Sequence, residues 1–132
     1  MTSCRTCPNC GERRDESHYK LKGNTARGGQ VRTWCDPCKR RYYANENMRR
    51  RYGITLEDYE RMEAAQGHCC AVCGAGVEDL PARVGRFHVD HCHETGKVRA
   101  LLCHWCNLAV GHLRDDPVRA LEVAKYLVQA KG

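Results

Sequence analysis

The spacing of hydrophobic and polar positions predicts a β-hairpin followed by a short helix in the second half of the chain. Residues 86–91 (RFHVDH) alternate as a half-buried strand does, and residues 97–103 (KVRALLC) are a second strand-like run. Residues 94–96 (ETG) favour the turn between them. The next stretch, residues 104–113 (HWCNLAVGHL), favours a short helix.

Two helices are also predicted before the hairpin. Residues 38–53 contain helix-forming side chains and no proline, and Gly53 favours a helix end. Thr55, followed three residues later by Asp58, is close to the capping-box pattern that starts a helix, and Gly67 favours its end. We expect the two helices to form a helix–turn–helix-like pair.

The C-terminal residues 114–132 predict a closing amphipathic helix. Asp116 suits the N-cap and Pro117 the first helical position. Apolar side chains then recur at mostly 3.6-residue spacing. No chemistry is evident in this segment, so we expect it to pack on the rest of the chain or on a partner subunit.

The composition indicates that the chain needs more than a hydrophobic core to fold. Its 132 residues include 11 cysteines and one phenylalanine, and 29% of them are charged. Small domains with so little apolar material generally depend on disulfides or structural metal. There is no apolar run of about 18 residues to span a membrane, and no hydrophobic N-terminal segment to act as a secretion signal. We therefore expect a cytoplasmic protein, in which clustered cysteines act as metal ligands.

Eight of the cysteines form four C-x-x-C pairs, a spacing that lets two thiolates reach one tetrahedral zinc ion from a tight turn. Two such pairs complete a four-cysteine site, so the chain is expected to bind two structural zinc ions. The expected ligands are Cys7, Cys10, Cys35 and Cys38 in the first site, and Cys70, Cys73, Cys103 and Cys106 in the second.

The register of the first site is open, because Cys4 and Cys7 also have C-x-x-C spacing. We prefer Cys10 to Cys4 because Gly11 follows Cys10, and zinc knuckles favour a glycine where the chain turns beneath the sulfurs. Cys4 is then a free thiol or an alternative ligand.

The positive charge of the protein is concentrated between the two predicted zinc sites. Residues 38–53 carry six basic side chains and one acidic one, a net charge of +5, against +6 for the whole chain. Lysine and arginine neutralise phosphates, which is the main source of sequence-independent affinity for nucleic acid. The alternative is a solvated helix face that only keeps the chain soluble. The candidate DNA-binding residues are Lys39, Arg40, Arg41, Arg49, Arg50 and Arg51.

The predicted hairpin and the helix after it contain polar residues that the zinc sites do not use. Asp90 offers an anionic oxygen and Asn107 a neutral one, and such ligands suit Mg²⁺ or Mn²⁺. The adjacent zinc ligands are expected to bring Asn107 back over Asp90 and His91. His91 can accept a proton from water that attacks a phosphodiester, and the ion can stabilise the leaving oxygen. Taken singly, each residue also has a structural explanation, such as capping a turn or a helix.

These motifs resemble those of the recombination endonuclease VII family, the phage-type branch of the HNH or ββα-metal nucleases. The similarity lies mainly in VDHCHETGKVRALLCHWCN, residues 89–107, and in CAVCG, residues 70–74. It continues in the upstream segments CPNCGERRDESHYK, WCDPCKRRYY and RRRYGITLEDYERM. The resemblance therefore covers nearly the whole chain.

The resemblance implies specific roles. Asp90 and Asn107 match the family residues that hold the divalent metal, His91 matches the general base, and His93 matches a histidine near the scissile phosphate. It also implies zinc at the second four-cysteine site and a homodimer with intertwined helices. Val110 stands where a well-known member has a glutamate one helical turn after the asparagine, which leaves the preference for branched DNA open.

We expect a small zinc-stabilised α+β fold. Its parts are an N-terminal zinc ribbon in residues 1–40, a basic helical linker in residues 41–67, and a ββα-metal (HNH-like) nuclease core with a C-terminal helix in residues 68–132. The expected function is a metal-dependent endonuclease that leaves 5′-phosphate and 3′-hydroxyl ends on duplex or branched DNA. It would use two structural zinc ions and one catalytic Mg or Mn ion. The alternatives are a zinc-module protein that binds nucleic acid without cutting it, or a structural zinc scaffold in a phage assembly complex.

Overall fold

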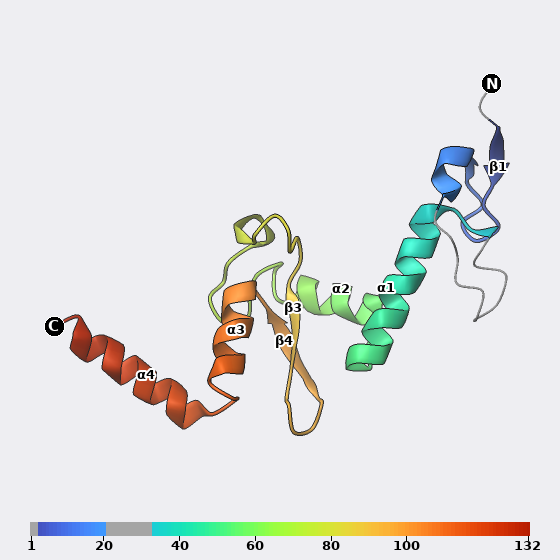
Figure 1. Cartoon of the computed structure of the whole chain (residues 1–132). Helices are drawn as coiled ribbons and strands as arrows, with labels where there is room; N and C mark the ends of the chain where they lie inside the picture. Colours follow the sequence, from blue (N-terminus) through green and yellow to red (C-terminus); the bar gives the residue numbers. More distant parts are fainter. Residues whose placement is uncertain (1–2, 21–32) are drawn as a thin grey trace. The chain divides into compact units, whose positions relative to one another are not determined.

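The structure of the chain is a computed structural model that describes residues 3–20 and 33–132 (Figure 1). It contains two compact units, Met1–Leu56 and Glu57–Gly132. Each unit has a two-stranded antiparallel sheet and a four-cysteine cluster, and in each a cysteine of the cluster directly follows a strand. The chain is therefore a small α+β protein with two four-cysteine clusters.

The first unit begins with the smaller sheet. β1 (Cys4–Thr6) pairs antiparallel with β2 (Arg13–Asp15). The short 3₁₀ helix η1 (Glu16–Tyr19) follows at once, because the Asp15 carboxylate accepts a hydrogen bond from the backbone N–H of Ser17 at 2.7 Å. This turn ends the hairpin and starts the connection to the long helix.

The long helix of the first unit is α1 (Asp36–Tyr52). It starts two residues before the predicted range of 38–53, because Pro37 suits the first turn of a helix and lacks the N–H that would be unsatisfied there. It ends at Gly53, whose φ of 70° is the left-handed conformation that closes a helix. The prediction of a helix that ends near Gly53 is confirmed.

Polar groups occupy much of the interior of the first unit. Cys7 and Cys35 are fully buried. Asp36 and Lys39 are buried as an ion pair, with Lys39 Nζ 3.8 Å from Asp36 Oδ1. Asp36 Oδ2 also accepts a hydrogen bond from the backbone N–H of Lys20 at 3.0 Å, which ties the start of α1 to the end of η1.

The second unit contains the predicted hairpin. β3 (His88–His91) pairs antiparallel with β4 (Val98–Leu102), and the turn between them includes Gly96 at a φ of 70°. α2 (Leu56–Ala65) and the 3₁₀ helix η3 (Val77–Asp79) precede the hairpin. The alternating pattern therefore predicted both strands, and the capping residues predicted the helix before them.

Two helices follow the hairpin. α3 (His104–His112) starts directly after β4 and contacts both strands, which gives the predicted ββα arrangement (Figure 1). α4 (Pro117–Ala130) starts after Asp116, whose carboxylate accepts hydrogen bonds from the backbone N–H groups of Val118 and Arg119. Both helix predictions are confirmed, including the N-cap of α4.

The apolar core of the second unit is small and centred on the hairpin. Leu101 is fully buried. The Tyr59 hydroxyl of α2 donates a hydrogen bond to the Phe87 carbonyl at 3.2 Å, and burial raises the pKa of Tyr59. Other buried side chains of this unit are Cys70, Leu80, Val89, Leu102 and Cys103. With so few apolar residues inside, the cysteine cluster has to supply part of the stability.

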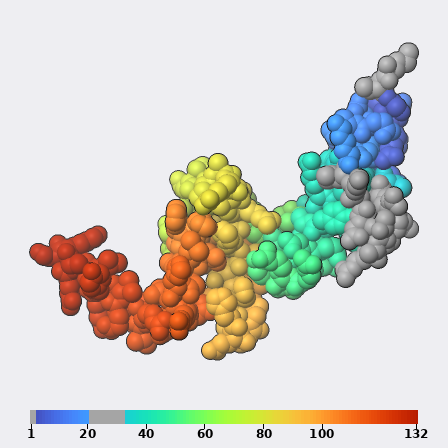
Figure 2. All heavy atoms as spheres, viewed as in Figure 1, coloured from blue at the N-terminus to red at the C-terminus, as the bar shows by residue number. Residues whose placement is uncertain are grey.

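α4 leaves large apolar side chains exposed to solvent. Figure 2 shows this C-terminal segment in red. The exposed side chains are Val118, Leu121, Val123, Tyr126, Leu127 and Val128. Neither α4 nor any other helix in the described part of the chain has the length and hydropathy needed to cross a membrane.

Candidate functional site

The first cysteine cluster has the dimensions of a tetrahedral zinc site. The Sγ atoms of its four members lie within 4.8 Å of one another. Cys7 and Cys38 are 4.0 Å apart at sulfur, and Cys10 and Cys35 are 3.9 Å apart. Zinc–sulfur bonds of about 2.3 Å in a tetrahedron place the sulfurs about 3.8 Å apart, whereas a disulfide would place them at about 2.05 Å. The structure thus groups Cys10, and not Cys4, with the other three.

The second cluster repeats this geometry with Cys70, Cys73, Cys103 and Cys106. The Sγ atoms of Cys73 and Cys103 are 3.7 Å apart. In both clusters a glycine donates its backbone N–H to the first cysteine carbonyl, from Gly11 to Cys7 at 2.8 Å and from Gly74 to Cys70 at 3.0 Å. Both glycines have a positive φ, 73° and 74°, which explains the preference for glycine in these knuckles.

The pKa values of the thiols differ within each cluster. Burial alone would raise the pKa of Cys7 and Cys70, but backbone N–H groups that point at each sulfur lower it to about 6. Burial raises the pKa of Cys38 to about 12 and also raises that of Cys106. Four thiols so close together cannot all ionise without a positive ion between them, and zinc binds thiolates. Both clusters are consistent with structural zinc.

The second cluster fixes the first turn of α3. Cys103 is the N-cap of this helix, and its Sγ accepts a hydrogen bond from the backbone N–H of Cys106 at 3.4 Å. Asn107, the next residue, donates its backbone N–H to the Cys103 carbonyl at 3.0 Å. The position of Asn107 therefore depends directly on two residues of the cysteine cluster.

The hairpin carries Asp90 and His91 at an irregularity in the strand pairing. Asp90 pairs with Ala100 and His91 pairs with Val98, so Arg99 is an extra residue on β4 between them. Such bulges bend a strand and redirect its side chains, and they often occur beside active sites. Here the bulge allows Arg99 to reach the carboxylate of Asp90.

Arg99 joins two carboxylates. Its Nε donates to Asp90 Oδ2 at 2.6 Å, and its Nη2 donates to Asp90 Oδ1 and to Asp115 Oδ1, both at 2.9 Å. Hydrogen bonds to Asp90 and then to Asp115 raise the pKa of Arg99. The hydrogen bond from Arg99 is also the main reason that the pKa of Asp115 is lowered. The side chain of Asp90 is only 12% exposed, so this ion pair is partly shielded from water.

The two predicted histidines lie together beside this network. The rings of His91 and His93 are 5.2 Å apart and nearly perpendicular. His93 Nδ1 is 2.9 Å from Asp115 Oδ2, and the backbone N–H of His93 donates to the same oxygen at 3.3 Å. The structure thus brings Asp90, His91 and His93 to one end of the hairpin. The approach of the Asn107 side chain to Asp90 and His91 stays a prediction.

The sequence pattern of a family described as Recombination endonuclease VII matches residues 45–129, well over half of the chain. The chain belongs to the recombination endonuclease VII family. The matched range includes the hairpin, the second cysteine cluster and α3, and it begins after the cysteines of the first cluster.

Among curated proteins, the chain is similar to two phage proteins. It is 42% identical over 65 residues to the Gene 59 protein of Mycobacterium phage D29, and 40% identical over 65 residues to the Gene 59 protein of Mycobacterium phage L5. Each match covers 48% of this chain and 37% of the relative, so the chain spans little more than a third of the length of these relatives.

Among solved structures, the chain is similar to the ββα-Me type II restriction endonuclease Hpy99I. The TM-score is 0.41 and the sequence identity is 20%. The match covers 96% of this chain and 66% of that enzyme.

Two residues at the site of this endonuclease VII family member were not predicted from the sequence. Arg99 occupies what looks like an ordinary outward position in a strand, and only the bulge turns it toward Asp90. Asp115 precedes the N-cap Asp116, so the pair of aspartates suggested a helix start and nothing more. The opposite charges of Arg99 in the hairpin and Asp115 in the RDDP segment were a signal that could have suggested that these two side chains pair.

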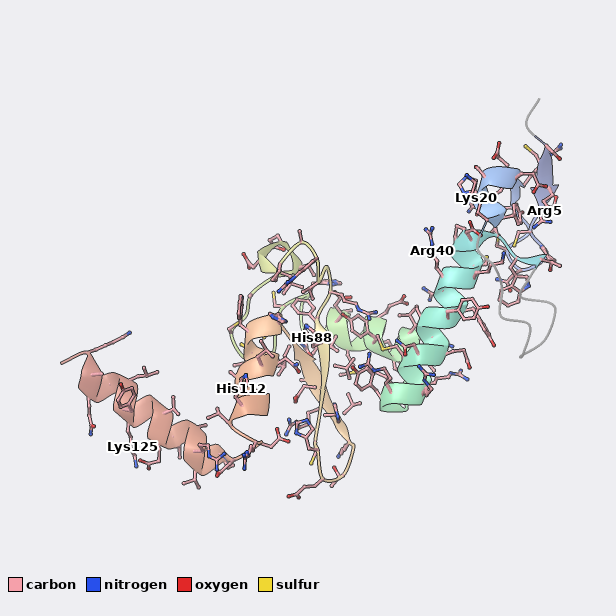
Figure 3. All side chains as sticks on the ribbon, in the orientation of Figure 1. Arg5, Lys20, Arg40, His88, His112 and Lys125 are labelled. Atoms are coloured by element: carbon pink, nitrogen blue, oxygen red, sulfur yellow. The ribbon has the colours of Figure 1, made fainter. Side chains whose placement is uncertain are left out.

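The predicted basic residues of the family member differ in their exposure. Lys39 is only 1% exposed and pairs with Asp36, so its ammonium group is not available to a phosphate in this structure. The arginines of α1 are exposed, and Figure 3 shows Arg40 projecting from the helix. The exposed set is Arg40, Arg41, Arg49, Arg50 and Arg51.

His88, labelled in Figure 3, is a further histidine of the hairpin. It is the first residue of β3, and His91 is the last. Its ring lies 5.5 Å from that of His104 on α3. Its Nε2 is buried without a hydrogen-bond partner among the described residues, and burial lowers its pKa, with a smaller contribution from His104. These features favour a neutral ring that packs α3 against the hairpin.

Proposed function

We propose that this protein is a metal-dependent, HNH-type endodeoxyribonuclease. The observation that carries the proposal is the cluster of Asp90, His91 and His93 on one hairpin, packed by α3, whose first turn contains both a cysteine of the second cluster and Asn107. Membership of the recombination endonuclease VII family supports the same chemistry. The nuclease core would lie in residues 68–132, with residues 41–67 as a basic linker and residues 1–40 as a zinc ribbon.

The donor set fits a Mg²⁺ or Mn²⁺ ion held by Asp90 and Asn107. In support of this, both oxygens of Asp90 already bind one cation, the guanidinium of Arg99. A carboxylate and an amide oxygen are hard ligands, which these ions prefer to sulfur. When bound, such an ion polarises a phosphate oxygen and stabilises the leaving 3′-oxygen.

The histidines would carry the proton chemistry. His91 is partly buried and lies directly after Asp90, where it can accept a proton from the attacking water. His93 is 60% exposed and anchored through Nδ1 to Asp115, so its other nitrogen can contact a phosphate oxygen. Attack by water on phosphorus with a 3′-oxygen leaving group yields 5′-phosphate and 3′-hydroxyl ends.

DNA would bind along the exposed arginines of α1 as well as at the hairpin. These side chains are long, charged and solvent-exposed, which suits contacts with the phosphate backbone and not with particular bases. Lys39 is left out of this surface because it is buried. Duplex and branched DNA both remain candidate substrates, and action in the cytoplasm of a host cell remains a prediction.

The active form is proposed to be a homodimer. The exposed apolar side chains of α4 recur along one helix, and a second copy of the same helix would cover them. Light scattering of the zinc-loaded protein tests this: a mass near 30 kDa supports the dimer, given a chain mass of 15.0 kDa. A mass near that of one chain contradicts it.

The experiment that tests the function uses zinc-loaded protein, Mg²⁺ and three DNA substrates in parallel: supercoiled plasmid, linear duplex and a four-way junction. Cleavage with 5′-phosphate and 3′-hydroxyl ends supports the nuclease, and the order of the rates gives the preferred structure. Binding of all three without cleavage, in Mg²⁺ and in Mn²⁺, would favour the alternative of a zinc-module DNA-binding protein. Neither binding nor cleavage would favour a structural zinc scaffold.

A further inference from the structure

Arg99 is bound to the carboxylate of Asp90, which the proposed function assigns as a ligand of a metal ion. Its Nε and Nη2 take one oxygen of Asp90 each, at 2.6 and 2.9 Å. A guanidinium bound in this two-point manner engages both oxygens of the carboxylate and neutralises its charge. A divalent ion that binds either oxygen of Asp90 therefore competes with Arg99 for it.

Asp115 offers Arg99 a second anchor. Its Oδ1 accepts from Arg99 Nη2 at 2.9 Å, while its Oδ2 is held by the ring and the backbone of His93. The backbone that carries it is unusual, because Arg114 and Asp115 both have a positive φ, 56° and 57°, which non-glycine residues rarely adopt. Two consecutive left-handed residues between α3 and α4 thus direct this carboxylate to the hairpin.

Arg99 remains accessible to a ligand although it is held at both ends. Its side chain is 35% exposed, and the anchored ring of His93 beside it is 60% exposed. The planar guanidinium presents paired N–H donors that match two oxygens of a phosphate. If Arg99 left Asp90 and stayed bound to Asp115, its guanidinium would be exposed to solvent beside the His93 ring.

We propose that Arg99 is a catalytic residue that exchanges partners: it competes with the divalent ion for Asp90, and once displaced it binds the scissile phosphate while Asp115 retains it. This inference rests on the proposed nuclease function. It gives roles to two residues that the predicted metal and proton chemistry does not include. Arg99 would bind the phosphate, and Asp115 would anchor Arg99.

The first test measures Mn²⁺ binding by calorimetry on zinc-loaded protein without DNA, and single-turnover cleavage separately. Arg99→Ala should bind Mn²⁺ about fivefold to tenfold more tightly, because the competing cation is gone. The same variant should cleave about 10²-fold more slowly, because a phosphate-binding donor is gone. A folding defect would weaken both, so zinc content and the unfolding temperature are measured alongside. Arg119→Ala, an exposed arginine of α4, is the control and should change neither quantity.

Asp115 is tested by a double-mutant cycle on Mn²⁺ affinity. Asp115→Ala should weaken Mn²⁺ binding, because a displaced Arg99 then has no carboxylate to move to. In the Arg99→Ala background the same change should have no effect on Mn²⁺ affinity. An equal loss in both backgrounds would mean that Asp115 acts on the ion directly, which overturns its role as an anchor.

Mn²⁺ affinity that is unchanged or weaker in Arg99→Ala overturns the proposal, whatever happens to cleavage. Arg99→Lys keeps the charge and loses the planar fork, so it should cleave more slowly than the parent protein, and full activity in it would also contradict phosphate binding by the guanidinium. Failure of the proposed function looks different, because the parent protein itself would then not cut DNA and Asp90→Ala would not change its Mn²⁺ binding.

Discussion

Gln66 and Leu101, 35 positions apart in the chain, are joined by a pair of hydrogen bonds. Gln66 Nε2 donates to the Leu101 carbonyl at 2.9 Å, and the backbone N–H of Leu101 donates to Gln66 Oε1 at 2.9 Å. The side chain thus pairs with the fully buried Leu101 of β4 as another strand would. Gln66 Nε2 also donates to the Cys69 carbonyl at 2.9 Å, so it ties the residue before Cys70 to the hairpin.

Replacing this side chain should destabilise the second unit. Gln66→Ala leaves the backbone N–H of buried Leu101 without its partner, whereas the Leu101 carbonyl keeps the hydrogen bond from the backbone N–H of Ala71 at 3.1 Å. The expected cost is about 1–3 kcal/mol in the free energy of unfolding. Urea unfolding of the zinc-loaded protein measures it. Glu57→Ala, at an exposed position on the first turn of α2, is the matched control and should stay within about 0.5 kcal/mol. Equal stability of the two variants would contradict the account of Gln66.

Loss of one thiol should empty the second zinc site and remove activity. Cys106→Ser deletes a cysteine of the cluster and disturbs the first turn of α3, which positions Asn107. Structural zinc sites contribute directly to folding, so the second unit should lose its cooperative unfolding. Elemental analysis should find one zinc per chain in this variant and two in the parent protein. Cys69→Ser, next to Cys70 but outside the cluster, is the control and should keep both zinc ions. Loss of zinc from this variant would mean that the ligands of the second site are wrongly assigned.

His91→Ala should slow single-turnover cleavage by about 10²–10⁴-fold, because proton transfer by a positioned base contributes about that much. DNA affinity measured without divalent metal should change little, since the exposed arginines of α1 are expected to supply most of it. His93→Ala is the comparison variant and should have a smaller effect. If His93→Ala is the slower of the two, the general base has been assigned to the wrong histidine.

Charge reversal at Arg49, Arg50 and Arg51 should weaken DNA binding at every sequence tested. The plot of log affinity against log salt concentration should also become shallower, by about 1 for each phosphate that the protein no longer neutralises. Reversal of three exposed basic residues elsewhere, Arg83, Arg119 and Lys131, controls for the change in total charge. An unchanged salt slope in the α1 variant would identify these arginines as a solvated helix face.

Elements that depend on neighbouring residues were predictable from the sequence. β3, β4, α1, α3 and α4 follow from local periodicity and capping residues, and the two cysteine clusters follow from C-x-x-C spacing, with Gly11 favouring Cys10 over Cys4. These features require no knowledge of contacts between distant residues. The strands β1 and β2 were not predicted.

Features that depend on distant contacts were not predictable. The bulge at Arg99 depends on how two strands align, and a shift of one position cannot be seen in an alternating pattern. Asp115 reaches His93 only because two residues adopt a rare backbone conformation. Lys39 was predicted to face DNA with its neighbours, but the fold of the first unit buries it against Asp36.

Asp90 and Asn107 are proposed to form a metal-dependent nuclease centre next to a structural zinc site. This proposal is tested by measuring cleavage of DNA by the zinc-loaded protein in Mg²⁺ and comparing it with cleavage by Asp90→Ala and Asn107→Ala under single-turnover conditions. We predict that both variants retain two zinc ions per chain and bind DNA as the parent protein does, but show no detectable cleavage. Full cleavage by either variant, with zinc and binding intact, would contradict the claim.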